Sequence, residues 1–229
     1  MTRIASVIIL VLALAMGFAA CGIEFILALD PPVFLEAVEA DDTFRAAIKI
    51  QYYETEFRGL EFYYRFYEDK SDVKPDMDLK SKEELDAAGF RRIMSAEFDE
   101  PAYYTPPLVV VPTASKSHYL EFTLDFGDEA NAFVTAYDTE DEVTLVSDDL
   151  QRDYAAFPIR RAVSDSPDQF KTFSDLDPDD EDLASLDPDY VLAKDLILVV
   201  YALAFGKQDL VVNAYSKPTY LLYINPFDS

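Results

Sequence analysis

The stretch that decides the fold runs from residue 60 to residue 68 and reads Leu-Glu-Phe-Tyr-Tyr-Arg-Phe-Tyr-Glu. Successive side chains of a β-strand point to opposite faces of its sheet. One face of this stretch is entirely apolar or aromatic and consists of Leu60, Phe62, Tyr64 and Phe66. The other face mixes charges with aromatic rings and consists of Glu61, Tyr63, Arg65 and Tyr67. The alternation predicts a β-strand over Leu60–Glu68.

The same period of two recurs along the chain. It is clearest over Tyr119–Phe126, where apolar residues alternate with Tyr, Glu, Thr and Asp in the pattern of a half-buried strand. Further strands are predicted over Val33–Val38, Phe44–Tyr53, Arg91–Phe98, Leu108–Val111, Phe133–Tyr137, Val143–Val146, Ala155–Arg160 and Thr219–Ile224. The apolar run Val191–Phe205 fits a buried strand or a helix, and its β-branched and aromatic residues, with Gly206 after them, favour the strand. Half of the residues are apolar, with abundant Tyr and Phe, so the chain can bury a core. We therefore expect a mainly β fold.

One short helix is expected within this β pattern. Ser81 and Glu84 have the spacing of a capping box, whose side chains satisfy free N–H groups at a helix start. Gly89 suits the left-handed conformation that ends many helices. These signals predict a helix over Lys82–Ala88. Farther along, Ser164–Asp189 is rich in Asp, Pro and Ser, and we interpret it as an acidic loop.

Two segments resemble parts of a fibronectin type III domain. The family opens with paired prolines, an apolar strand and a Gly-Tyr-x-Val-x-Tyr-Arg strand. This chain has Pro31-Pro32, then Ile48 and Ile50, then Gly59-Leu60-Glu61-Phe62-Tyr63-Tyr64-Arg65. The family's last hairpin is similar to Leu196–Phe205 followed by Tyr215-Ser216-Lys217-Pro218. Tyr190 lies where the family has its tyrosine corner.

This resemblance implies a fibronectin-III or immunoglobulin-like sandwich built from residues 31–70 and 190–227. The segment between them, residues 71–189, would be a β-rich insertion that carries the short helix and ends in the acidic loop. Its strands would form a small sandwich or barrel packed on the first one. Insertions of this kind are tolerated at exposed loop tips.

The first twenty residues have the composition of a secretory signal peptide. Arg3 supplies a positive charge, Ile4–Ala15 forms an apolar core, and small residues follow. The small residues are Gly17, Ala19 and Ala20. The next residue, Cys21, is the only cysteine of the chain. Small residues directly before a cysteine resemble the lipobox of bacterial lipoproteins.

The lipoprotein resemblance implies that the Ala20–Cys21 bond is cut and that Cys21 carries a diacylglyceryl group and further fatty acyl chains such as palmitate. Residues 21–30 would be a tether, and the body would face the periplasm or the cell exterior. Two or more acyl chains give stable attachment, because one chain holds only weakly. The alternatives are an uncleaved transmembrane helix, which needs about 20 apolar residues, and a secreted product without lipid.

The charge of the chain limits its partners. Its formal net charge is −25, and such a surface repels nucleic acid, whose binding needs clustered Lys and Arg. It repels anionic lipid headgroups as well, so attachment to a membrane must come from the lipid. We expect no nucleic-acid partner. A single cysteine permits no intrachain disulfide.

Residue types for catalysis are scarce. His118 is the only histidine, so a zinc site lacks further His or Cys ligands. The sequence has neither a Gly-x-Ser-x-Gly motif nor a glycine-rich phosphate loop. We interpret His118 as a structural residue at the start of a strand and predict no catalytic residues and no enzyme. The alternative is an envelope hydrolase that uses a pair of its many carboxylates.

Alternate aspartates in the acidic loop resemble the start of a calcium-binding loop. They are Asp175, Asp177 and Asp179. The sixth position of an EF-hand is Gly and the twelfth is Glu, whereas here they are Asp180 and Leu186. The loop is therefore not an EF-hand, and we predict no metal and no cofactor besides the covalent lipid. A looser calcium site would make the chain a calcium-dependent binding module, which is a further alternative.

The second face of the Leu60–Glu68 strand is a candidate binding face. Tyr63 and Tyr67, together with Tyr53, would line the outside of a sheet. Exposed aromatic side chains bind sugars or protein partners, although an insertion packed over them would bury them instead. The sequence thus predicts a membrane-anchored envelope lipoprotein with a non-catalytic role in adhesion, scaffolding or ligand presentation.

Overall fold

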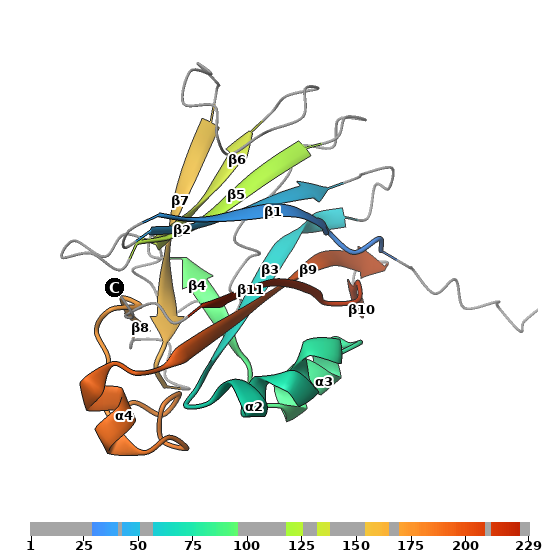
Figure 1. Cartoon of the computed structure of the whole chain (residues 1–229). Helices are drawn as coiled ribbons and strands as arrows, with labels where there is room; N and C mark the ends of the chain where they lie inside the picture. Colours follow the sequence, from blue (N-terminus) through green and yellow to red (C-terminus); the bar gives the residue numbers. More distant parts are fainter. Residues whose placement is uncertain are drawn as a thin grey trace, which may run out of the picture.

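The computed structural model describes residues 29–40, 43–50, 57–95, 118–125, 132–137, 154–164, 170–208 and 212–224. Within these ranges the chain is mainly β, as predicted, and two antiparallel sheets are accompanied by three short α-helices (Figure 1). The strands predicted at Leu108–Val111 and Val143–Val146 lie outside the described residues. The fibronectin-like type of the sandwich stays a prediction.

The first sheet contains most of the strands. In spatial order they are β1 (Val33–Ala40), β2 (Thr43–Ile50), β5 (His118–Asp125), β6 (Ala132–Tyr137), β7 (Tyr154–Ala162) and β4 (Arg91–Ser95). The short strand β8 (Phe170–Lys171) also pairs with β7. All of these pairs are antiparallel, and β2 and β5 pair without a register shift along their full length.

The second sheet is built around a long pair of strands. β3 (Phe57–Tyr67) and β9 (Ile197–Gln208) run antiparallel along the whole of β3. Beyond β9 lie β10 (Val212–Tyr215) and β11 (Thr219–Ile224), which pair with successive parts of it. Strand β3 of residues 31–70 and β9 of residues 190–227, the two segments that the resemblance assigns to one sandwich, therefore lie side by side in this sheet, whereas β1 and β2 belong to the first sheet.

The two sheets meet on both sides. The first two residues of β4 pair with β3 and its remaining residues pair with β7, so β4 belongs to both sheets. At the other side β11 returns beside β1. There the Thr219 hydroxyl donates a hydrogen bond to the carbonyl oxygen of Pro32 at 2.5 Å. The sheets thus enclose a common core.

The strands from residues 71–189 are part of these same sheets. β4 lies between β3 and β7, and β5 pairs with β2. This differs from the predicted insertion that forms its own small sandwich or barrel. Backbone N–H and C=O groups at a strand edge need hydrogen-bond partners. The edges of β2 and β3 find those partners in strands from the middle of the chain.

The main core lies between the sheets, and one face of β3 forms its centre. The residues that β3 buries there are Leu60, Phe62, Tyr64 and Phe66, the face that the alternation picks out. The rings of Phe62 and Phe122 stack with their centroids 5.1 Å apart, which joins β3 to β5. Burial of one side chain of this size contributes about 1.5–3 kcal/mol. The quoted stretch therefore supplies the centre of the fold.

A second apolar cluster covers the outer face of the second sheet. After β3 the chain continues through α2 (Lys70–Val73), the 3₁₀ helix η1 (Lys74–Asp78) and α3 (Lys82–Ala87), which lie beneath this sheet in Figure 1. The cluster consists of Tyr63, Tyr67, Val73, Leu85, Phe90, Ile197, Val199, Tyr201 and Leu203. Both faces of β3 are therefore interior surfaces.

Helix α3 forms where the sequence predicts it. The Ser81 hydroxyl accepts a hydrogen bond from the backbone N–H of Glu84 at 3.2 Å. The Glu84 carboxylate accepts from the N–H of Lys80 at 2.6 Å, one residue before the position that a capping box uses. Gly89 follows the helix with a φ of +84°, a left-handed conformation that favours glycine.

The segment before β9 corrects a prediction. The sequence predicts a strand from Val191, but helix α4 (Pro188–Ala193) occupies this region and β9 begins at Ile197. Tyr190, compared above with a tyrosine corner, lies on α4 and is 41% exposed. A residue that is exposed on a helix does not form the buried corner of a sandwich.

The local signals for α4 are an Asp-Pro pair at its start and a lysine in the left-handed backbone conformation at its end. The Asp187 carboxylate accepts a hydrogen bond from the N–H of Asp189 at 2.9 Å and so caps the helix. Pro188 suits the first turn, where a backbone N–H has no helical acceptor. Lys194 ends the helix with a φ of 57°. The apolar run that suggested a strand from Val191 is therefore divided between α4 and β9, because the helix ends at Lys194.

Candidate functional site

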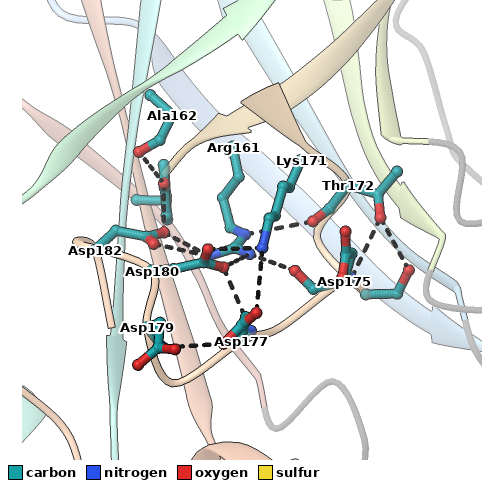
Figure 2. Close-up of polar contacts among 11 residues, drawn as sticks. Arg161, Ala162, Lys171, Thr172, Asp175, Asp177, Asp179, Asp180 and Asp182 are labelled. Carbon is teal, nitrogen blue, oxygen red and sulfur yellow. Dashed lines mark hydrogen bonds and ion pairs between the residues drawn. The ribbon is translucent and has the colours of Figure 1, made fainter. Parts of the chain in front are cut away.

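The acidic loop folds around a buried arginine. Arg161 lies on β7 opposite Lys171 of β8, and its side chain is fully buried. Figure 2 shows Arg161 and Lys171 pointing toward carboxylates of the loop formed by residues 172–187. Arg161, Lys171, Asp180, Asp182 and Tyr64 are called the Arg161 network below.

The guanidinium of Arg161 donates to acceptors on three sides. Its Nη1 lies 2.9 and 2.7 Å from the two carboxylate oxygens of Asp182. Its Nη2 donates to Asp180 Oδ2 at 2.9 Å and to the carbonyl oxygen of Asp175. Its Nε donates to the carbonyl oxygen of Thr172 at 3.3 Å. All three nitrogens are therefore engaged by the loop.

Two further side chains complete the network. The Tyr64 hydroxyl, on the main-core face of β3, donates to Asp182 Oδ2 at 2.7 Å. The Lys171 ammonium donates to Asp180 Oδ1 at 2.7 Å and lies 3.8 Å from a carboxylate oxygen of Asp177. Two cations thus face the two buried carboxylates, so the charges of the network balance.

Burial and the neighbouring charges shift the pKa of Arg161 in opposite directions. Burial alone lowers the pKa of its guanidinium, because the charged form loses its hydration. The carboxylate of Asp182, the oxygen of Tyr64 and the hydrogen bonds that Arg161 donates to Asp180 and Asp182 outweigh this cost and raise the pKa of Arg161. Burial, followed by the charge of Asp182, raises the pKa of Tyr64 well above its ordinary value. Tyr64 therefore stays protonated and donates its hydrogen bond.

The loop is also held by apolar contacts. Phe173 and Leu183 are buried in the main core, and Leu176 and Leu186 pack against it. The rings of Tyr64 and Phe173 meet edge to face with their centroids 5.3 Å apart. The loop that the sequence marks as acidic is thus anchored by apolar residues at several points as well as by Arg161.

The three calcium candidates do not converge on one point. Asp175 contributes its backbone carbonyl to Arg161. The Asp177 carboxylate accepts from the N–H of Asp179 at 3.0 Å, and Asp179 itself is exposed. Within the described ranges no group of three or more His, Cys, Asp or Glu side chains is arranged to hold a metal ion. The loop carboxylates that are buried bind Arg161 instead.

A second polar cluster holds the helices over the second sheet. Asp76 of η1 accepts hydrogen bonds at one carboxylate oxygen from Arg65 Nη1 at 3.0 Å and from the Tyr67 hydroxyl at 2.6 Å. The Tyr201 hydroxyl donates to the backbone carbonyl of Asp76 at 2.5 Å. Arg65 also donates to the carbonyl oxygen of Ala88. These five residues are called the Asp76 cluster.

Tyr63 has its own buried partner. Its hydroxyl donates to Glu61 Oε2 at 2.6 Å, and Arg92 Nη1 donates to the other oxygen of Glu61 at 3.0 Å. Burial, with the charge of Glu61 next, raises the pKa of Tyr63. Burial and the hydrogen bond to Asp76 raise the pKa of Tyr67 in the same way.

The predicted aromatic binding face is therefore covered. Tyr63 and Tyr67 are each 3% exposed, because η1 and α3 pack over them and bind their hydroxyl groups or rings. Lys82 of α3 lies 5.6 Å from the centroid of the Tyr63 ring. Of the two outcomes considered for this face, the structure has the covered one. Tyr53, the third candidate, lies outside the described residues.

The other candidate residues are placed as follows. His118 is the first residue of β5 and pairs with Ile50 of β2, at the strand start that the sequence predicts. Cys21 lies outside the described residues. The described helices include none that is long and apolar enough to cross a membrane.

Sequence reasoning missed Arg161, although a signal was present. Ile159 and Arg161 are spaced by two and so share one face of β7, Val163 continues this spacing just after the strand, and all three are buried. A charged residue on the apolar face of a strand requires a buried counter-charge. The aspartates at 180 and 182, close behind in the sequence, are those counter-charges.

Chemically, the clusters of the described residues are ion pairs and hydrogen bonds that join separate segments. The Arg161 network ties the acidic loop to β3 and β7, and the Asp76 cluster ties η1 to β3 and β9.

No family model matches this chain, and no curated protein and no solved structure shows significant similarity to it.

Proposed function

We propose that the chain is an acylated lipoprotein of a bacterial cell envelope whose β body has a non-catalytic binding or scaffolding role. The proposal rests on the distance along the chain between Cys21 and the folded body. Leu29, eight positions after Cys21, is already buried in the main core. Cys21 itself directly follows the small residues that end the apolar segment.

This short connection sets how far the body can lie from a bilayer. A fully extended chain spans at most about 3.3–3.6 Å per residue, so eight positions reach no more than about 30 Å. Pro32 is fixed to β11 through Thr219, which makes the start of β1 part of the rigid body. A lipid on Cys21 would therefore hold the β1 side of the sheets close to the membrane surface.

The charge of the body supports lipid attachment rather than surface adsorption. A net charge of −25 is repelled by anionic headgroups. Two or more acyl chains, each methylene of which contributes about 0.8 kcal/mol, provide stable attachment without a basic face. The body is thus tethered and remains surrounded by solvent.

The non-catalytic role is supported by how the buried charges are used. Asp180 and Asp182 bind Arg161, and Glu61 binds Tyr63 and Arg92. The carboxylates of Asp180, Asp182 and Glu61 therefore join parts of the fold to one another. The hydrolase and the calcium-dependent module remain alternatives, and no contact among the described residues favours either one.

The test is mass spectrometry of the protein recovered from bacterial membranes. We expect a mature N-terminus at Cys21 that carries a diacylglyceryl group, together with labelling by an alkyne analogue of palmitate. The Cys21→Ala variant should lose the label and accumulate as the longer precursor. A Leu192→Ser variant, altered far from the N-terminus, is the control and should be processed normally. Native protein that begins at Met1 with an unmodified Cys21 would refute the proposal.

A further inference from the structure

The chain between β3 and β4 leaves the second sheet and returns to it without joining a strand pair. Residues 69–89, which we call the lid, contain α2, η1 and α3 and lie beneath the second sheet in Figure 1. The two strands that flank the lid pair with each other, since Tyr64 of β3 lies opposite Arg91 of β4. Movement of the lid away from the sheet would therefore break none of the strand pairs that the structure describes.

The lid is attached by few apolar side chains. Within residues 69–89, which the structure describes throughout, only Val73 and Leu85 are buried, and most of the other side chains are exposed. Its helices have between four and six residues, and helices this short are not stable by themselves in water. Segments with few buried apolar contacts are the ones that open locally in native proteins. The lid therefore has the properties of a segment with low local stability.

Water reaches the polar contacts of the lid. Arg65 of β3 and its partner Asp76 of the lid are both partly exposed. Lys82 of the lid lies over the rings of Tyr63 and Tyr215, with its nitrogen 5.6 and 5.4 Å from their centroids, and it is partly exposed as well. Hydrogen bonds to water replace such contacts at little net cost when the groups separate.

The acidic loop, in contrast, is locked to the fold. Phe173 and Leu183 fix it in the main core, and its departure would leave the buried guanidinium of Arg161 without its two carboxylates. A buried charge without a partner is strongly unfavourable. Of these two segments, the lid is the one that can open while the rest of the fold persists.

The surface beneath the lid combines aromatic rings with polar groups. The hydroxyls of Tyr67 and Tyr201 donate hydrogen bonds to Asp76 of the lid, whereas the hydroxyl of Tyr63 donates to Glu61 of β3. An aromatic side chain with a polar tip tolerates contact with water at that tip. The hydroxyls of Tyr67 and Tyr201 can therefore donate to water once the lid has moved away.

We propose that residues 69–89 open as one unit while both sheets stay intact, and that this opening uncovers the aromatic face formed by Tyr63, Tyr67 and Tyr201. Tyr63 and Tyr67 belong to the binding face predicted from the sequence, and in this mechanism they are accessible in the open state only. The inference concerns the fold of the body and does not rest on the lipid anchor or on the proposed binding role.

The first test is hydrogen exchange measured by mass spectrometry at urea concentrations below the unfolding transition. The full protein is used, in phosphatidylcholine nanodiscs if it carries lipid and in buffer if it does not. We expect residues 70–88 to exchange early and with little dependence on urea. Residues 198–205 of β9 should exchange last and with a strong dependence, because unfolding of the whole chain exposes more surface than opening of the lid.

Two substitutions destabilise the closed lid from within. Ser81→Ala removes the cap of α3, and Gly89→Ala places a side chain at a φ of +84°. Each should speed the exchange of residues 70–88 about fivefold. Asp187→Ala, which removes the equivalent cap from α4 outside the lid, is the matched control and should leave the exchange of residues 70–88 unchanged.

Tyr64→Phe separates opening of the lid from unfolding of the whole chain. Tyr64 faces the main core and bonds the Arg161 network, so its substitution lowers the stability of the entire fold. The exchange of β9 should become faster in this variant, and the exchange of the lid should stay the same. Equal acceleration of the two segments would show that the lid exchanges only when the whole chain unfolds, which would overturn the inference.

Nitration of tyrosines by tetranitromethane, located by mass spectrometry, separates opening of the lid from fraying of its helices. Tyr67 and Tyr201 should react much faster than Tyr64, and Ser81→Ala should speed their reaction about fivefold, as it speeds exchange. Rapid exchange of residues 70–88 with Tyr67 and Tyr201 as slow as Tyr64 would mean that the helices fray over a face that stays covered. That result would also overturn the inference.

Discussion

Two arginines hold segments onto the sheets of this protein, and they do so in different surroundings. Arg161 is 0% exposed, and its partners Asp180 and Asp182 are 7% and 2% exposed at their side chains. Arg65 is 32% exposed and its partner Asp76 is 17% exposed. The bond lengths are similar, since the shortest ion-pair distances are 2.7 Å and 3.0 Å. Water can therefore replace a lost partner around Arg65 but not around Arg161.

This difference means that contact distance is a poor guide to stability. Loss of one partner of a buried pair leaves an uncompensated charge, which costs about 3–5 kcal/mol. Exposed pairs contribute about 0–1 kcal/mol, because water and salt screen them. The Arg161 network is thus expected to be essential for the loop, and the Asp76 cluster to be an auxiliary contact over an apolar interface.

The largest effect is expected for Asp182→Ala. The change removes two contacts to Arg161 and one to Tyr64, and we expect the free energy of unfolding to fall by about 3–5 kcal/mol. Urea unfolding followed by tyrosine fluorescence measures it. Asp179→Ala, at an exposed carboxylate of the same loop, is the control and should change stability by less than about 0.5 kcal/mol. Equal effects of the two substitutions would contradict the difference in burial.

A matched pair of tyrosines sharpens the comparison. Tyr64 and Tyr67 lie on opposite faces of β3, and each donates to one aspartate. Tyr64→Phe should cost about 1.5–3 kcal/mol, because its hydroxyl bonds a buried charge. Tyr67→Phe should cost about 1 kcal/mol, because Asp76 is partly hydrated and keeps Arg65. Urea unfolding of both variants in one buffer shows which loses more stability. A larger loss for Tyr67→Phe would show that solvent exposure does not determine how much these hydrogen bonds contribute.

Stability should also fall in alkaline solution. The pKa of Tyr64 is raised in the folded state above its ordinary value of 10.0, by burial and then by Asp182. Above pH 10 the unfolded chain therefore loses this proton while the folded chain keeps it. Its stabilising contribution is complete below pH 10 and is lost at about 1.4 kcal/mol per pH unit above it.

The measurement for this pH dependence is urea unfolding between pH 9 and pH 11. Because Tyr63, Tyr67 and Tyr201 also have raised pKa values, the native slope is a sum over several tyrosines. Tyr64→Phe should reduce the slope above pH 10 by one tyrosine's share. An unchanged slope in that variant would mean that Tyr64 ionises equally in the folded and unfolded states.

The smallest effect is expected on the surface of α3. Lys82 and Asp86 form a pair four residues apart at 2.7 Å, with Asp86 half exposed. Asp86→Asn should cost about 0.3–0.5 kcal/mol, and the cost should vanish in high salt. Thermal unfolding at low and high salt tests this. If Asp86→Asn lowered the free energy of unfolding as much as Asp182→Ala, this surface ion pair would be as important for stability as the Arg161 network.

Much of the fold follows from local patterns. The alternation over residues 60–68 predicts a strand, and β3 buries the predicted face in the main core. Ser81 and Glu84 predict α3, and the serine caps it. Residues 219–224 form β11 with the predicted bounds. These signals are readable because backbone geometry and caps depend on neighbouring residues only.

Other features could not be read in this way. The outward face of β3 carries Glu61 and Arg65 and so resembles a surface, yet α2, η1 and α3 bury it. Asp187 and Pro188 do signal a helix start, but the apolar run after them also fits a strand. The acidic loop looks like a solvated linker or a metal loop until Arg161 is placed inside it.

The sequence by itself determined the mainly β class, the strand faces and the caps of α3, because a period of two and a capping side chain act within a few residues. Only the tertiary structure decided which strands pair, which tyrosines are covered and which carboxylates are buried. Those outcomes depend on segments far apart in the chain, and on whether water can reach a charge once they have come together.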